Sequence, residues 1–103
     1  MQQIMIISTY PNKNSISKIA NELVENKIVA CVNIVKISSI YSWQGKIENT
    51  SEFMALFKTT QKNKKLLKEK IKASHPYEVP EIAEIDITTI NKSYLKWMVE
   101  STT

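Results

Sequence analysis

Arginine is absent from this chain, and glycine, cysteine and histidine occur once each among its 103 residues. All 14 basic residues are therefore lysines, and the formal net charge is +4. Arginine is the usual residue for bidentate contacts to phosphates and to guanine. Its absence argues against sequence-specific recognition of nucleic acid and favours a compact, soluble domain with a mildly basic surface.

The single cysteine, Cys31, excludes a disulfide within the chain and both paired-cysteine zinc patterns. One unpaired cysteine is consistent with a reducing compartment. The first residues, MQQIMIISTY, have no basic segment before a short apolar run, which is unlike a secretory signal, and no later run reaches spanning length. We therefore expect a cytoplasmic protein that does not insert into a membrane.

Length and composition indicate the size of the fold. Apolar residues make up 43% of the chain and charged residues 23%, which are ordinary values for a globular protein. The sequence contains no linker, internal repeat or low-complexity segment. We expect a single domain over residues 1–103 with one modest hydrophobic core.

The spacing of apolar residues predicts four strands and three helices. The strands are expected at residues 4–10, 30–43, 46–59 and 82–88, and the two main helices at 15–27 and 61–74. The long middle strands pair as a hairpin around Gln44 and Gly45, the first of them as one strand or as two joined by a bulge. Asn14 or Ser15 is expected to cap the first helix, and Asn91 a short last one.

This order of elements predicts a ferredoxin-like α+β sandwich. Two split β-α-β units with right-handed crossovers give an antiparallel sheet with both main helices on one face. The other face is then uncovered, although the central strands carry apolar residues on both sides. We expect another copy of the chain to cover it, which predicts a homo-oligomer.

The stretch HPYEVPEI, residues 75–82, joins the second main helix to the last strand and holds the only histidine. Pro76 disfavours helical geometry at His75, so the helix is expected to end there, and Pro80 stiffens the entry to the strand. The loop is therefore rigid. One interpretation is a helix stop that packs subunits together, and the other is a preorganised binding loop.

The side chains of that loop suit a ligand or a metal ion. His75 supplies an imidazole, the commonest borderline metal ligand near neutral pH, beside the phenol of Tyr77 and the carboxylates of Glu78 and Glu81. One histidine per chain does not build a closed site of nitrogen and sulfur ligands by itself. Further ligands would come from a neighbouring subunit.

Five motifs, in this order, resemble the divalent-cation tolerance (CutA) family over nearly the whole chain. They are ACVNI at residues 30–34, SIYSWQGKIE at 39–48, KTT at 58–60, HPYEVPEI at 75–82 and YLKW at 94–97. The resemblance implies a ferredoxin-like homotrimer whose hairpins wrap neighbouring subunits. It also implies a response to divalent metals, including copper, without a catalytic mechanism. The similar architecture of PII signalling proteins suggests a sensor role by analogy.

The resemblance also implies candidate binding residues. In the family, the SIYxWxGK motif lines a cleft between subunits, so Trp43 and Lys58 are candidates for holding a small anionic ligand. Tyr77 and Glu81 of the loop join them as ligand-binding candidates. No catalytic residue is assigned, and a protein partner that would read the signal is not identified.

Copper-binding members carry a cysteine at the end of the first strand and two adjacent histidines before the PY pair. The corresponding residues here are Ser8, Ser74 and His75, so one ligand of three is present. Binding of Cu(II) or another divalent cation is therefore expected to be weak, with His75, Glu78 and Cys31 as the candidate metal ligands. Cysteine in a strand is, alternatively, most often a small buried hydrophobe.

Two other functions stay open at this point. A small enzyme could use His75 with Glu78 or Glu81 for acid–base chemistry. Aromatic residues on a four-stranded sheet, here Phe53 and Phe57, are also typical of RNA-recognition domains, although the usual signature of that family is missing.

Overall fold

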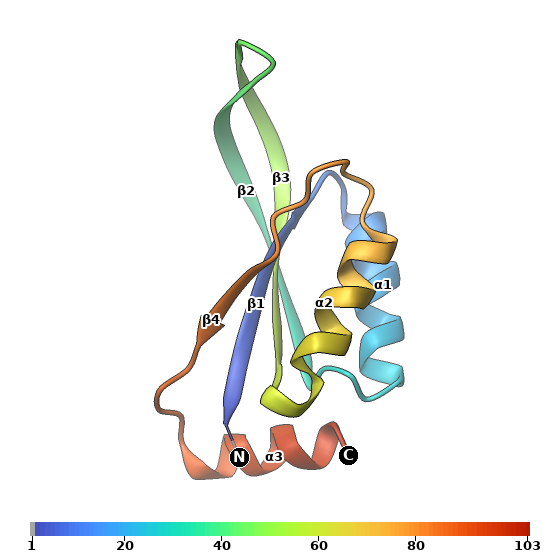
Figure 1. Cartoon of the computed structure of the whole chain (residues 1–103), viewed down its shortest axis with the longest axis vertical. Coiled ribbons are helices and arrows are strands. Elements are labelled where there is room, and N and C mark those ends of the chain that lie inside the picture. The colour runs from blue at the N-terminus through green and yellow to red at the C-terminus, as the bar shows by residue number, and fades with distance from the viewer. Residues whose placement is uncertain (1) are drawn as a thin grey trace.

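The computed structural model describes residues 2–103. Its elements follow the order β-α-β-β-α-β, with one further helix at the end (Figure 1). The strands are β1 (Gln3–Tyr10), β2 (Cys31–Trp43), β3 (Lys46–Thr60) and β4 (Ala83–Asp86). The helices are α1 (Lys13–Glu25), α2 (Lys64–Ser74) and α3 (Lys92–Ser101), and a 3-10 turn, Gln61–Asn63, precedes α2. The predicted mixed α+β fold is confirmed.

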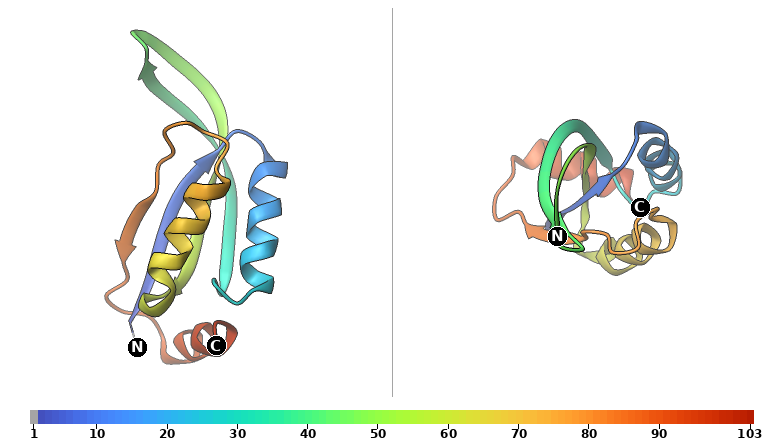
Figure 2. Two further views of the ribbon diagram at one scale, coloured as in Figure 1. Left: turned by 45° about the vertical axis from the view of Figure 1, so that its right-hand side comes forward. Right: turned by 90° about the horizontal axis from the view of Figure 1, so that it is seen from above.

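The four strands form one antiparallel sheet in the order β2-β3-β1-β4. This strand order, together with the order of elements, is the ferredoxin-like arrangement. Helices α1 and α2 lie side by side on the same face of the sheet, and α3 lies across one end of it (Figure 2). The hairpin of β2 and β3 extends beyond the other elements, and with it the whole structure is 45 Å long (Figure 1).

The core lies between the sheet and the two main helices. Alternate residues of β1, Ile4 and Ile6, point to this side and are fully buried, as is Phe57 of β3. Leu23 of α1 and Leu67 of α2 pack into the same cluster. Strands repeat every two residues and helices every 3.6, so these sequence periods bring one apolar side of each element together. Full burial of each such side chain contributes about 1.5–3 kcal/mol.

The opposite side of the sheet, which we call the open face, is covered by neither α1 nor α2. Its apolar residues are Met5, Ile7, Val35, Ile37, Met54, Leu56 and Ile85. They are half-buried or exposed, and Val35 is 45% exposed. The uncovered apolar face that the sequence predicts is therefore present within one chain.

The hairpin is a continuous two-stranded ribbon. Each residue of β2 has a partner in β3, from Cys31 opposite Lys58 to Trp43 opposite Lys46, so the alternative of two strands joined by a bulge is wrong. The turn residues Gln44 and Gly45 have φ values of 50° and 79°. Such positive values suit a two-residue turn that follows the twist of the strands.

The helix boundaries differ from the expected ones at both ends of α1, which ends at Glu25 rather than at Lys27, and at the start of α2. Helix α1 begins at Lys13, because the Asn12 side chain accepts a hydrogen bond of 2.9 Å from the Ser15 backbone N–H, so a cap at Asn14 or Ser15 is wrong. Residues 61–63 form a 3-10 turn rather than α-helix. The predicted end of α2 is confirmed, since His75 has an extended backbone.

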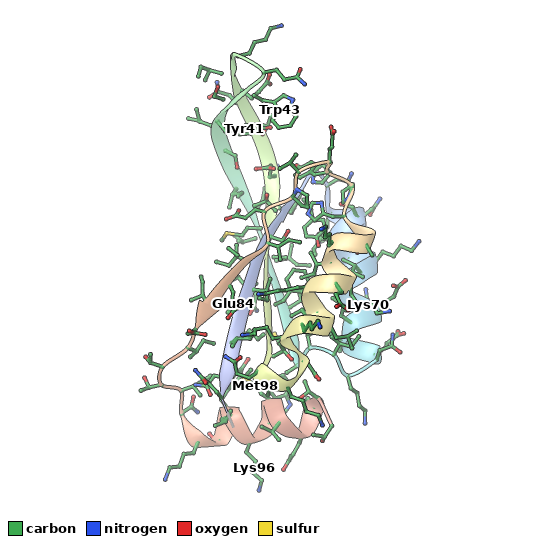
Figure 3. All side chains as sticks on the ribbon, in the orientation of Figure 1. Tyr41, Trp43, Lys70, Glu84, Lys96 and Met98 are labelled. Carbon is green, nitrogen blue, oxygen red and sulfur yellow. The ribbon has the colours of Figure 1, made fainter. Side chains whose placement is uncertain are left out.

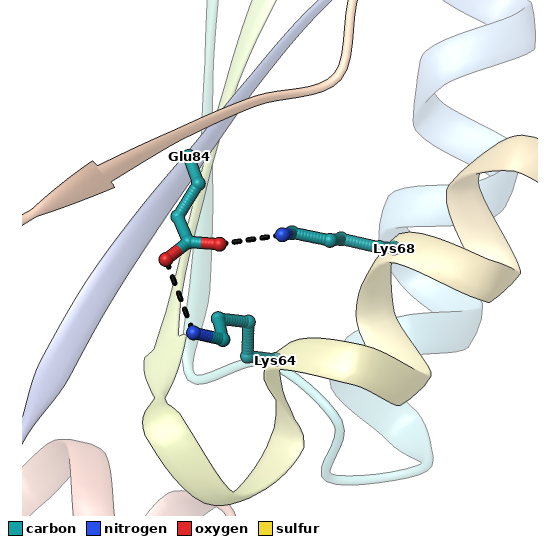
Figure 4. Close-up of polar contacts among 3 residues, drawn as sticks. All are labelled: Lys64, Lys68 and Glu84. Atoms are coloured by element: carbon teal, nitrogen blue, oxygen red, sulfur yellow. Dashed lines mark hydrogen bonds and ion pairs between the residues drawn. The ribbon is translucent and has the colours of Figure 1, made fainter.

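Helix α2 is joined to β4 by a group of charged residues. Glu84 accepts hydrogen bonds from Lys68 and, at 3.1 Å, from Lys64 (Figure 4). These two lysines hold the pKa of the Glu84 carboxyl below its usual value, the Lys68 hydrogen bond having the larger effect. The pairs are partly exposed, so they fix orientation more than they stabilise the fold.

Within residues 2–103, no helix combines the length and the apolar character that crossing a bilayer requires.

Candidate functional site

A cavity of about 720 Å³ opens on the open face, beside the hairpin. Residues of β1, β2 and β3 form its floor, and the loop after α2 forms one wall. Its aromatic and charged lining residues are Tyr41, Trp43, Glu52, Tyr77, Glu78 and Glu81. Tyr41 and Trp43 lie on the projecting part of the hairpin (Figure 3). Volume and lining are within the range of sites for small organic molecules.

The loop is attached to the sheet through Tyr77. Its hydroxyl donates a hydrogen bond of 2.7 Å to Oε1 of Glu52, which is buried in β3. Burial, then this hydrogen bond and the negative charge of Glu52, raise the pKa of Tyr77 well above its usual value. The phenol therefore stays protonated and keeps donating to the carboxylate at physiological pH.

His75 lies behind this wall, towards the core. Its ring stacks on Tyr10 with centroids 4.2 Å apart, and its Nδ1 accepts a hydrogen bond of 3.1 Å from the Tyr77 backbone N–H. The neutral ring therefore carries its proton on Nε2, which is 3.1 Å from Oγ of Ser8. Burial lowers the pKa of His75, and a hydrogen bond with the Thr9 backbone offsets part of this change.

The three candidate metal ligands are not brought together within one chain. Cys31 is paired with Lys58 near the far end of the hairpin strands, and its Sγ is 3.7 Å from Oδ1 of Asn33. Glu78 lines the cavity, whereas both ring nitrogens of His75 are already hydrogen-bonded. Across residues 2–103, no three histidine, cysteine or acidic side chains are grouped to hold a metal ion. The side chains of a single chain do not fit a divalent cation.

Ser8 and Ser74, the two positions that the family resemblance aligns with a cysteine and a histidine, have different environments. Ser8 is buried and faces the His75 ring, so the fold brings Ser8 and His75 together. Ser74 donates a hydrogen bond of 2.8 Å to the Lys70 carbonyl of its own helix. A hydroxyl is a harder and weaker ligand than thiolate or imidazole for copper.

The candidate ligand-binding residues are divided between two places. Trp43, Tyr77 and Glu81 line the same cavity. Lys58 does not line it, and its Nζ instead lies 5.8 Å from the centre of the Tyr94 ring of α3. The cavity therefore has an acidic and aromatic lining that contains no lysine.

Sequence reasoning missed Glu52 and Tyr10. Glu52 stands two residues before Met54 and four before Leu56, so the period of two places it on the open face with them. An acidic residue within this alternating row of apolar residues was the sequence signal that could have identified Glu52. Tyr10 gave no signal, because only the folded chain shows its ring against His75.

Comparison with known proteins identifies the family of the chain. The family model described as CutA1 divalent ion tolerance protein matches residues 4–101. The divalent-cation tolerance protein CutA of Thermus thermophilus is 44% identical over 103 residues, covering 99% of each chain. That of Pyrococcus horikoshii is 39% identical over 99 residues, covering 96% of this chain and 97% of that protein.

Solved structures give the same result for the fold. The crystal structure of Pyrococcus horikoshii CutA in 3 M guanidine hydrochloride has a TM-score of 0.94 at 39% identity, covering 97% of this chain and 99% of that one. CutA of the bacterium Xylella fastidiosa has a TM-score of 0.94 at 32% identity, with complete coverage of both chains.

Proposed function

The chain belongs to the CutA1 divalent ion tolerance family, and from that premise we propose that it is a homotrimeric tolerance protein that binds a small ligand or a metal ion in clefts between subunits. The observation that carries the proposal is the cavity between the hairpin and the loop of residues 75–82, which opens on an uncovered apolar face. A neighbouring subunit on that face would close the cavity.

The open face supports the assembly. Its central strands carry Met5, Ile7, Met54 and Leu56 where a covered sheet would carry core residues. An interface built from such residues is typical of obligate oligomers. Light scattering at micromolar concentration is expected to give the mass of three chains, and a stable monomer would contradict the proposal.

Metal binding at His75 is proposed to be weak and to need ligands from a neighbouring subunit. We expect calorimetric titration of metal-free protein with Cu(II) to show weak, saturable binding that is lost in His75→Ala. Unchanged binding in the variant would instead assign the metal to the carboxylates. Absence of binding would make the tolerance phenotype indirect and leave a small effector as the ligand.

We propose no catalytic activity. The ring nitrogens of His75 are hydrogen-bonded to Ser8 and to the Tyr77 backbone rather than to Glu78 or Glu81, so the acid–base pairing of the enzyme alternative is not formed. RNA binding is also disfavoured. Phe53 and Phe57 pack on the helix side, and the open-face positions of the two central strands, β1 and β3, hold no aromatic residue within residues 2–103.

Three further predictions from the sequence stay predictions. They are a PII-like signalling role, a cytoplasmic location and a single domain over residues 1–103. The signalling role is supported by the cavity alone. Identification of a protein whose binding to this chain changes when the cavity is occupied would test it.

A further inference from the structure

The charged side chains that line the cavity are all acidic. Glu52, Glu78 and Glu81 contribute three carboxylates, and no lysine is among the lining residues. Lys58, the residue expected to attract an anion, lies against Tyr94 instead. The side chains that one chain contributes to the cavity therefore carry negative charge, which favours a cationic ligand over the anionic one suggested by the sequence.

Glu52 is the most constrained of these carboxylates. It is 7% exposed, its Oε1 accepts the hydrogen bond from Tyr77, and no ion pair to it is formed within residues 2–103. A buried carboxylate without a counter-ion is costly, and one phenol compensates only part of that cost. A cation in the cavity would compensate the rest.

The size and walls of the cavity decide what kind of cation fits. A bare divalent ion needs several ligands within about 2–2.6 Å, and the described residues do not group three such side chains. A volume of about 720 Å³ instead suits an organic molecule. The rings of Tyr41, Trp43 and Tyr77 line the same space, and aromatic faces attract quaternary and primary ammonium groups.

We propose that this cavity binds an organic ammonium cation, with the charged group beside Glu52 and the rings of Tyr41 and Tyr77, and the rest of the ligand extending towards Trp43. The inference rests on the proposed function, because a neighbouring subunit closes the side of the cavity that is open in one chain. Ile7, Ile37 and Met54 form an apolar floor for the rest of the ligand.

Two probes of equal shape test the role of charge. Choline and 3,3-dimethylbutan-1-ol differ by the positive charge alone, since a quaternary carbon replaces the nitrogen. The Trp97→Phe variant leaves Trp43 as the sole indole, so its fluorescence reports the cavity. We expect choline to change this fluorescence saturably and the neutral alcohol to bind about tenfold more weakly or worse.

Glu52→Gln is the matched variant, because its amide oxygen still accepts the Tyr77 hydrogen bond while the charge is lost. Choline affinity is expected to fall about tenfold in this variant, with no change for the alcohol. Glu69→Gln on the exposed side of α2 is the control and is expected to leave both affinities unchanged. Equal affinity for the two probes, or an unaltered choline affinity in Glu52→Gln, would overturn the proposal.

Light scattering on the same samples tests the proposed trimer separately from the ammonium site. A trimeric mass without choline binding would overturn the ammonium site alone and leave the assembly intact. A monomeric mass with charge-dependent choline binding would support the site and overturn the proposed assembly. Filling of the cavity by a neighbour's side chain would abolish the choline response and so count against the site.

Discussion

Individual polar residues on the buried side of β1 have unusual surroundings. Ser8 and Tyr10 are fully buried, and the His75 ring packs against both. The Tyr10 hydroxyl has no well-formed hydrogen bond within residues 2–103, although Ser8 lies near enough to offset part of its pKa change. Burial raises the pKa of Tyr10 to about 12, so this group is held neutral.

Tyr10→Phe is expected to stabilise the protein by about 1 kcal/mol at neutral pH, because the buried hydroxyl that lacks a good partner is removed. Urea unfolding would measure the change. Tyr77→Phe is the control with the opposite sign: its hydroxyl has a partner in Glu52, so its loss is expected to cost about 1 kcal/mol. Destabilisation by Tyr10→Phe would show that its hydroxyl is satisfied in solution.

The pH dependence of the same variant follows from linkage. The pKa of Tyr10 is about 12 in the folded protein and near 10.0 when unfolded, so the folded state keeps the proton longer. Ionisation of Tyr10 therefore leaves the stability unchanged below pH 10 and lowers it progressively as pH rises from 10 through about 12. The free energy of unfolding of Tyr10→Phe is therefore expected to fall less steeply than that of the unaltered protein over this interval.

At the scale of elements, helix α1 is terminated by a C-terminal cap that contains no glycine. Lys27 N–H bonds to the Val24 carbonyl and Ile28 N–H to the Leu23 carbonyl, which is a Schellman motif. The residue in the left-handed conformation is Lys27, with φ of 59°, where glycine is usual. Leu23 and Ile28 are both buried in the core. The geometry is therefore imposed by packing at the cost of local strain.

Lys27→Gly is expected to stabilise the chain by about 1 kcal/mol, since glycine adopts positive φ without a Cβ clash. Chemical denaturation would measure the shift in the midpoint. Lys27→Ala is the matched control, because it removes the exposed side chain but keeps the Cβ. It is expected to change stability little, and an equal gain in both variants would contradict the backbone argument.

At the scale of the whole molecule, two of the exposed apolar residues, Val24 and Val35, lie on different surfaces of the chain. Val35 lies on the open face opposite Met54, and Val24 lies on α1, away from that face. Their exposed fractions are almost equal, 45% and 44%. Only Val35 would be buried in the proposed trimer. The two residues are therefore equally exposed in one chain and differ only once the trimer forms.

Val35→Lys is therefore expected to dissociate the trimer, because each interface would bury an unpaired ammonium group. Sedimentation or light scattering would show the mass falling to one chain while far-ultraviolet circular dichroism stays native-like. Val24→Lys is the control and is expected to keep the trimeric mass. A trimeric Val35→Lys protein would place the interface elsewhere.

The sequence by itself determined the order of elements, the fold class and the family. Apolar residues at periods of two and 3.6 mark strands and helices because side chains alternate across a strand and repeat around a helix. Pro76 marks the end of α2 for an equally local reason, a clash with the preceding residue. Such signals involve neighbours in the chain, so they can be read without a structure.

Only the tertiary structure decided which candidate side chains meet. It places Trp43, Tyr77 and Glu81 around one cavity, adds Glu52, and leaves Lys58 and Cys31 outside. The 3-10 turn before α2 and the cap at Asn12 are further cases where geometry differed from pattern. These outcomes depend on strand register and loop path, because a shift of one residue would turn each side chain to the opposite face.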